Sequence, residues 1–168
     1  MTLKQFNSLD KDAATAELLK SCGSSKWVSF MMEGFPFASE DHVEKKATEV
    51  WYDKCEKEDW LEAFTHHPKI GDAKSLQQKF NSTKEWAASE QSGVQTADKI
   101  IIEQLAKGNK EYENKFGFIF IVCATGKTAE EMLYLLQDRL QNNYEEELKI
   151  AMKEQDKITQ LRLKKLLA

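Results

Sequence analysis

Apolar residues in this chain recur every three to four positions, the spacing that places side chains on one face of a helix, and they do not alternate as in strands. The clearest of these stripes is formed by Val43, Ala47, Val50 and Trp51. No linker, repeat or low-complexity segment interrupts the pattern. We therefore predict an all-α fold, with a single compact helical domain over residues 1–168.

Several helix starts are indicated by capping signals, in which a serine or threonine is followed three positions later by glutamate. Ser82 and Thr128 open such sequences, and Ser39 is followed directly by two acidic residues that suit a first helical turn. We also expect Thr96 to cap a helix.

The segment from Phe118 to Ala124 departs from the helical pattern, because it is continuously apolar and rich in β-branched and aromatic residues. We predict that it is extended. A single extended segment has no partner strand in this sequence, so its backbone groups would be left to meet side chains or a ligand. A buried connection within the core is the alternative interpretation.

Charge and composition argue against two classes of protein. With a net charge of −4, a pI near 5.5 and interspersed Lys and Glu, the chain lacks the basic excess of nucleic-acid-binding proteins. No stretch approaches the roughly 18 apolar residues of a membrane span, and neither a signal peptide nor a Ser-Lys-Leu ending is expected.

Cys22, Cys55 and Cys123 form no CxxC pair, which is typical of a reducing compartment. We expect a cytoplasmic protein.

The candidate chemistry centres on His67, which directly precedes Pro68. Proline disfavours helical geometry in the residue before it, so His67 is expected in a turn, and Gly71 supplies a second turn. Histidine titrates near neutrality and is therefore a natural acid or base. Glu90, on a helix predicted to start near Thr83, is its candidate partner. A turn that merely ends a helix is the alternative interpretation.

His66 and His67 also raise the question of a metal site, with Cys55 or Glu90 completing the ligand set. Neighbouring residues in an extended turn point in opposite directions, whereas histidine ligands on one element usually stand three or four positions apart. We therefore predict no metal, and we expect only His67 to face the site.

Arg162 is the least expected polar residue, because it falls on the apolar face of a helix predicted to begin near Tyr144. Its role there is structural if it pairs with a buried carboxylate or extends its stem along the surface. Alternatively, its two-pronged N–H geometry receives a carboxylate or imide oxygens of a substrate, for which arginine is better suited than lysine. The other residues on this face are Leu148, Ala151, Gln155, Ile158 and Leu166.

The four tryptophans lie on helical stripes without interleaved basic residues, so we expect core positions and not a platform for stacking bases. They are Trp27, Trp51, Trp60 and Trp86.

Several short motifs follow one another in a characteristic order along the chain. They are His67-Pro68-Lys69-Ile70-Gly71, the segment from Trp86 to Gly93, Asn109, Tyr112, the segment from Phe116 to Ala124, and Leu161-Arg162-Leu163. In this order they resemble the OHCU decarboxylases, enzymes of urate breakdown. The resemblance runs from Gln5-Phe6-Asn7 through Pro36-Phe37 to Arg162.

The resemblance implies an enzyme that converts 2-oxo-4-hydroxy-4-carboxy-5-ureidoimidazoline to (S)-allantoin and carbon dioxide. No cofactor is expected, because conjugated carbonyl and imine groups in the substrate can hold the electron pair themselves. The implied partner is this small molecule, with no nucleic acid and no membrane, and the implied assembly is a homodimer.

The resemblance also assigns residues to roles. His67 would protonate the carbanion, and Glu90 would orient the substrate or the imidazole. The implied substrate-binding positions are Pro68, Ala87, Gln91, Phe120, Ile121, Val122, Cys123, Ala124 and Arg162. Family members often carry serine three residues before the glutamate, where this chain has Ala87, so one hydroxyl contact is missing or is supplied by Ser89.

Two alternative functions stay open at this point. One is a non-catalytic helical adaptor that uses the His67 turn and Arg162 at a protein interface, and the other is a metal-assisted ureide hydrolase. An enzyme of the resembled kind requires His67, Glu90 and Arg162 to converge on one concave site.

Overall fold

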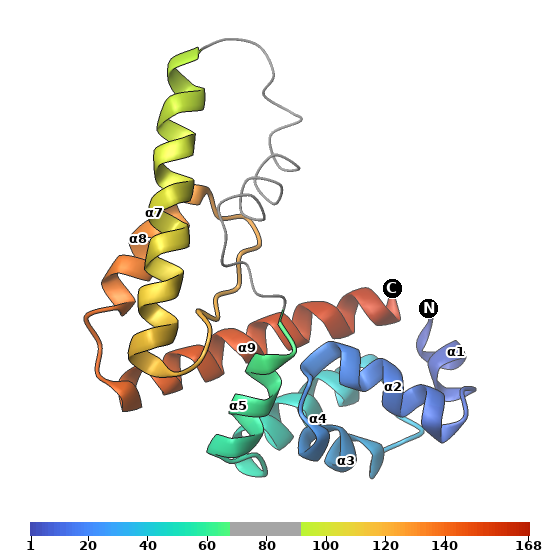
Figure 1. Ribbon diagram of the computed structural model, residues 1–168. Coiled ribbons are helices and arrows are strands. Elements are labelled where there is room, and N and C mark those ends of the chain that lie inside the picture. The colour runs from blue at the N-terminus through green and yellow to red at the C-terminus, as the bar shows by residue number, and fades with distance from the viewer. Residues whose placement is uncertain (68–91) are drawn as a thin grey trace. The chain divides into compact units, whose positions relative to one another are not determined.

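The computed structural model describes residues 1–67 and 92–168, with side chains after the gap described from Lys99 onward. Within these ranges the chain forms eight helices and no strand (Figure 1), which confirms the all-α prediction. The helices are α1 (Leu3–Asn7), α2 (Lys11–Cys22), α3 (Ser25–Met32), α4 (Glu40–Asp53), α5 (Lys57–Thr65), α7 (Ser92–Phe116), α8 (Ala129–Arg139) and α9 (Tyr144–Leu167).

The chain divides into two compact units. Unit 1 comprises Met1–His67, Ile121–Cys123 and Ile150–Ala168, and unit 2 comprises Pro68–Phe120 and Ala124–Lys149. Helix α9 therefore begins in unit 2 and continues through unit 1. A single domain over residues 1–168 stays a prediction.

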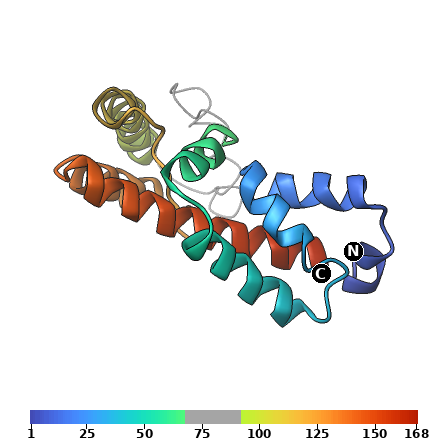
Figure 2. The same ribbon diagram turned by 90° about the horizontal axis from the view of Figure 1, so that it is seen from below.

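The core of unit 1 forms between helices α1 to α5 and the later turns of α9, which run between α2 and α4 (Figure 2). The stripe predicted on α4 is confirmed, because all four of its residues are buried. Ser39 caps α4 as predicted, its side chain accepting a hydrogen bond from the backbone N–H of His42. Local sequence signals therefore account for the position and orientation of α4.

Trp27 and Trp51 belong to this core and the half-buried Trp60 packs against it, and the indole N–H groups of all three are bonded to backbone carbonyls. Trp27 Nε1 donates to a carbonyl of α4 at 3.0 Å, Trp51 to a carbonyl of α9 at 2.9 Å, and Trp60 to the carbonyl of Trp51 at 3.2 Å. Because an unbonded buried N–H costs about 1–3 kcal/mol, these bonds favour one packing of the helices. The predicted core role is confirmed for Trp27 and Trp51, Trp60 packs against the core, and Trp86 lies outside the described residues.

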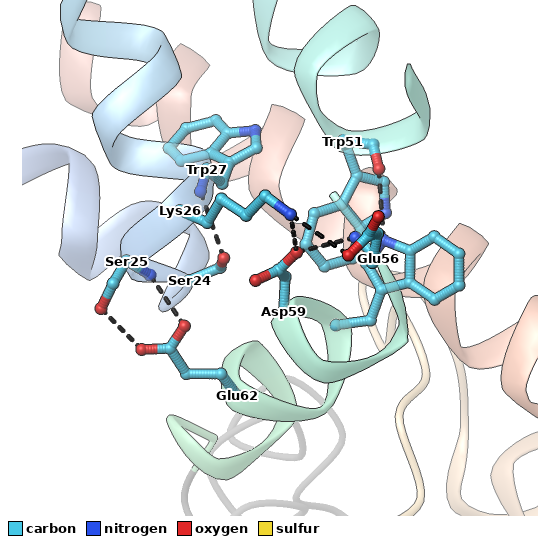
Figure 3. Close-up of polar contacts among 9 residues, drawn as sticks. Ser24, Ser25, Lys26, Trp27, Trp51, Glu56, Asp59 and Glu62 are labelled. Carbon is cyan, nitrogen blue, oxygen red and sulfur yellow. Dashed lines mark hydrogen bonds and ion pairs between the residues drawn. The ribbon is translucent and has the colours of Figure 1, made fainter. Parts of the chain in front are cut away.

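Polar contacts fasten the start of α3 to α5 (Figure 3). The Glu62 carboxylate accepts hydrogen bonds from the backbone N–H of Ser25 at 2.9 Å and from its hydroxyl at 2.6 Å. Lys26 Nζ lies 3.1 Å from an oxygen of Asp59. The first N–H groups of a helix lack partners within it, and its dipole favours a carboxylate there. These contacts fix α5, and with it the position of His67, which follows the helix.

In unit 2, helices α7 and α8 approach closely at Gly108, where an added Cβ would lie 2.7 Å from Leu136 Cδ2. Three polar side chains are buried nearby. Glu147 accepts hydrogen bonds from the Tyr112 hydroxyl and, at 2.7 Å, from Arg139 Nε. Since the buried charges compensate one another, this cluster holds α7, α8 and the start of α9 together.

The remaining sequence predictions about elements have mixed outcomes. The capping box at Thr128 is present at the start of α8, and α9 begins at Tyr144 as predicted. The prediction that Thr96 caps a helix is wrong, because α7 begins at Ser92 and Thr96 lies inside it. Thr96 is followed three positions later by lysine, so it lacks the reciprocal bond of a capping box. Ser82 lies outside the described residues.

The segment from Phe118 to Ala124, which departs from the helical pattern, forms neither helix nor strand. Phe118 and Ile121 are buried in it, and its other residues are half-buried. In the described parts of the chain, no helix has the length and apolar character needed to cross a membrane.

Candidate active site

His67 stands just past the end of α5, and its ring reaches α9. Its Nε2 lies 2.5 Å from Oε1 of Gln155. The backbone N–H of His67 donates to the carbonyl of Phe64 at 3.3 Å, so the turn follows the last turn of the helix directly. The predicted placement of His67 in a turn outside a helix is confirmed.

The amide of Gln155 is fully buried and is held at both ends. Its Nε2 donates to the carbonyl of Cys22 at 3.4 Å and to the hydroxyl of Thr159 at 3.1 Å, while its oxygen faces His67. The histidine ring is thereby connected through α9 to the last turn of α2.

The approach of α5 to α2 depends on Gly23, the residue that ends α2. Its φ of 88° lies in the left-handed region that favours glycine, and an added Cβ would lie 2.7 Å from Cβ of His66. His66 is exposed, whereas His67 is bonded to Gln155. The two adjacent histidines therefore have different environments, in keeping with the prediction that one of them faces the site.

Arg162 lies seven residues after Gln155 on α9, which is two helical turns or about 10 Å along the axis. Its Nη1 donates to the carbonyls of Lys20 at 3.4 Å and Ser21 at 3.2 Å. These carbonyls end α2, where partners within the helix are lacking and the dipole favours a cation. Burial lowers the pKa of Arg162. Its charge at neutral pH is retained, since arginine is not deprotonated in proteins.

The structural alternative for Arg162 takes a form that the sequence did not predict. That alternative was an ion pair with a buried carboxylate or a stem extended along the surface, and the ion pairs among the described residues include none with Arg162. Backbone carbonyls receive Nη1 instead. Nη1 of the Arg162 guanidinium therefore has a structural role. The predicted contact with substrate would be made by Nη2 and Nε.

The segment Ile121–Cys123 is tied to α9 next to Gln155. The N–H of Cys123 donates to Oε2 of Glu154 at 2.7 Å. One backbone donor that the resemblance assigns to substrate is thus bonded to a carboxylate of the protein itself. A carboxylate on this amide also indicates that the position suits an anionic acceptor.

Phe120 and Ala124, the other two members of the predicted backbone segment described here, belong to unit 2. The Phe120 ring packs against Tyr112 with centroids 5.1 Å apart, and the Arg139 guanidinium lies 4.6 Å from its centroid. The half-buried side chain of Phe120 thus packs against the buried polar cluster of Tyr112, Arg139 and Glu147 in that unit. Its main-chain role stays a prediction.

Pro68, Ala87, Glu90 and Gln91 lie outside the described residues, so their predicted roles are not tested. Within unit 1, the other predicted site residues contact α9 or belong to it. His67 contacts Gln155, the backbone of Cys123 contacts Glu154, and Arg162 lies on the same helix.

Sequence reasoning assigned no function to Glu154 or Gln155. For Gln155 a signal was available, since an amide on the apolar face of a helix must find hydrogen-bond partners when buried. For Glu154 we find no such signal, because its partner is a backbone N–H 31 positions away.

The thiol of Cys22, whose backbone carbonyl accepts a hydrogen bond from Gln155, is not a nucleophile. Burial raises the pKa of Cys22 to about 12, so the reactive thiolate is not populated at neutral pH. In the described ranges, no group of three His, Cys, Asp or Glu side chains is arranged to hold a metal ion.

The family model of the OHCU decarboxylases matches residues 7–164. The chain belongs to this family. The matched residues include parts of both units, so the OHCU decarboxylase pattern covers the molecule as a whole.

The chain matches some family members over nearly their whole length and others over less than half of it. A crystal structure of OHCU decarboxylase in the presence of (S)-allantoin has 36% sequence identity and a TM-score of 0.71, covering 90% of this chain and 96% of that chain. The uric acid degradation bifunctional protein TTL of Arabidopsis thaliana is 38% identical over 145 residues, or 86% of this chain and 44% of that protein. The 2-oxo-4-hydroxy-4-carboxy-5-ureidoimidazoline decarboxylase of Halalkalicoccus jeotgali is 24% identical over 167 residues, or 99% of this chain and 92% of that protein. The chain spans less than half the length of the bifunctional relatives it matches.

Proposed function

We propose that this chain decarboxylates 2-oxo-4-hydroxy-4-carboxy-5-ureidoimidazoline to (S)-allantoin, as a step of urate breakdown. The proposal is carried by one observation. Helix α9 contains Arg162 and is contacted by His67 and by the backbone of Cys123, which come from separate parts of the sequence. The choice of substrate is supported by relatives, one of which bears the name of this decarboxylase, while another was crystallised in the presence of (S)-allantoin.

The reaction breaks the bond between the carboxylate and the ring carbon. Carbon dioxide leaves, and the electron pair stays on the ring, where the carbonyl and imine groups delocalise it. Because the substrate holds this charge itself, we propose that no cofactor takes part. The protein has to turn the carboxylate out of the ring plane, stabilise the developing charge and deliver one proton to one face.

The roles follow from the chemistry of each group. His67 delivers the proton to the carbanion carbon as the general acid of the reaction. Arg162 donates its remaining N–H groups to carboxylate or imide oxygens of the substrate. Glu90 orients the substrate or the imidazole, and Gln91, Pro68 and the Ala87 position complete the pocket, as the family pattern implies.

Backbone groups of Phe120–Ala124 complete the proposed binding site. Glu154 now accepts the N–H of Cys123, so a substrate oxygen at that amide would take the place of the Glu154 carboxylate. We further propose a homodimer, which light scattering would report as twice the 19.4 kDa chain, and a cytoplasmic location, which fits three cysteines that form no CxxC pair.

The test is to generate the unstable substrate in situ and to follow circular dichroism. We expect the protein to accelerate formation of a single allantoin enantiomer above the spontaneous reaction. Racemic product at the spontaneous rate would refute the proposal and favour an adaptor. We also expect activity to survive exhaustive chelation, whereas a loss that zinc restores would favour the metal-assisted alternative.

A further inference from the structure

We infer that Gln155 is a positioning residue that fixes the tautomer of His67, and that Nδ1 is therefore the ring nitrogen that exchanges a proton with substrate. The second half rests on the proposed function. The first half concerns the protein alone.

The orientation of the Gln155 amide follows from its partners. The carbonyl of Cys22, 3.4 Å from Gln155 Nε2, can only accept hydrogen bonds, so the NH₂ end of the amide must point toward it. The hydroxyl of Thr159, 3.1 Å from the same nitrogen, takes the second hydrogen. The end that faces His67 is consequently the oxygen, which is an acceptor only.

An acceptor at 2.5 Å requires a donor, so Nε2 of His67 must carry hydrogen. This holds for the neutral ring and for the imidazolium. The opposite tautomer would place two lone pairs face to face. Gln155 and Cys22 are fully buried and Thr159 nearly so, and this burial leaves little room for water to relieve such a contact.

The proton balance then assigns the two nitrogens. In the imidazolium both carry hydrogen, and the carbon–carbon bond of the substrate breaks to release carbon dioxide and leave an electron pair on the ring carbon. The hydrogen on Nδ1 moves to that carbon, and the ring becomes neutral with its remaining hydrogen on Nε2, still bonded to Gln155. Solvent restores the Nδ1 proton before the next turnover.

The first test needs no variant. In the full chain labelled with ¹⁵N-histidine, we expect the neutral ring of His67 to show its hydrogen on Nε2, with an Nε2–H signal protected from exchange. His66, which is exposed, serves as the internal reference for an unconstrained ring. A neutral His67 with its hydrogen on Nδ1 would overturn the inference.

The second test compares two glutamines on α9. Gln155→Met removes the acceptor while keeping length, and we expect kcat to fall about tenfold or more, with KM nearly unchanged and the Nε2–H preference lost. Gln160→Met is the matched control, since Gln160 Nε2 also donates to a carbonyl and a threonine hydroxyl, those of Glu44 and Thr48, at 3.1 and 2.9 Å. Equal kcat in the two variants would refute the positioning role.

The outcomes separate this inference from the proposed function. If Gln155→Met does not fold, the wild-type spectrum alone decides the tautomer. A chain with hydrogen on Nε2 but no decarboxylase activity would refute the role of Nδ1 together with the proposed function. An active chain with hydrogen on Nδ1 would refute the inference alone.

Discussion

His67 and its neighbour His66 offer a direct test of the proposed proton donor, because the same substitution can be made at both. His67→Asn should lower the rate of allantoin formation by about 10²–10⁴, the usual contribution of a positioned acid. His66→Asn should be nearly silent, since His66 is exposed and asparagine keeps the Cβ that lies against Gly23. Circular dichroism of the product measures rate and enantiomeric purity together. A wild-type rate in His67→Asn would refute the assignment.

Arg162 is expected to have both a structural and a binding role. Loss of its contacts with the end of α2 in Arg162→Ala should cost about 1–2 kcal/mol of unfolding free energy, since the group is only half-buried. Arg162→Lys should keep most of this stability, because an ammonium also suits a helix carboxyl terminus. Both variants should raise KM, since lysine lacks the fork.

Thermal midpoints and Michaelis constants of the two Arg162 variants separate these roles. If both midpoints fell equally and the folded protein kept its normal KM, Arg162 would be purely structural and would leave the proposed site.

The sequence predicted single residues well where the signal was local. Pro68 is adjacent to His67 and restricts it directly, and a charge on an apolar helix face is visible at Arg162. The contact of Gln155 with Cys22, by contrast, joins residues 133 positions apart. Only the packing of α9 against α2 creates it, so no local pattern contained it.

At the level of elements, the junction of α2 and α5 should be sensitive to one methyl group. Gly23→Ala forces an L-residue into the left-handed region and places its Cβ against His66, so we expect a loss of about 2–4 kcal/mol. Gly117→Ala has a similar φ of 74° but no atom within 4 Å, and should cost about 1–2 kcal/mol. Denaturant unfolding measures both. Equal losses would show that backbone strain alone matters at Gly23.

Helix starts were predictable where side chain and backbone pair within four residues, as at Ser39 and Thr128. Thr96 shows the limit of this reasoning, since a threonine without an acidic partner is tolerated inside a helix. The Cys123 segment was recognised as non-helical, yet its bond to Glu154 depends on tertiary packing. Elements follow from local chemistry, whereas the site is assembled from contacts between elements.

For the whole molecule, stability should fall steeply at alkaline pH. Burial raises the pKa of Cys22, Cys55 and Tyr52 to about 12, from ordinary values of 9.0 for the thiols and 10.0 for the phenol. Between these values the unfolded chain binds fewer protons than the folded chain, so stability decreases as pH rises. The contribution is complete below pH 9 and is lost toward pH 12.

We therefore expect the thermal midpoint, measured under reducing conditions, to be insensitive to these groups below about pH 9 and to drop above it. Cys22→Ala should make the drop shallower, because one of the titrating groups is removed. A drop of unchanged steepness in this variant would contradict the linkage.

Helix α9 contains residues of both units, and this affects how the protein unfolds. Its first turn is anchored by Glu147 in unit 2, and its later turns carry the carbonyl that receives Trp51 in unit 1. Because helical order is cooperative along the chain, melting of either unit should fray α9 into the other. Tryptophan fluorescence, to which Trp27, Trp51 and Trp60 of unit 1 contribute, should then follow the same transition as far-UV circular dichroism. Two separated transitions would contradict this; a single one means that a stabilising substitution in either unit protects both from heat.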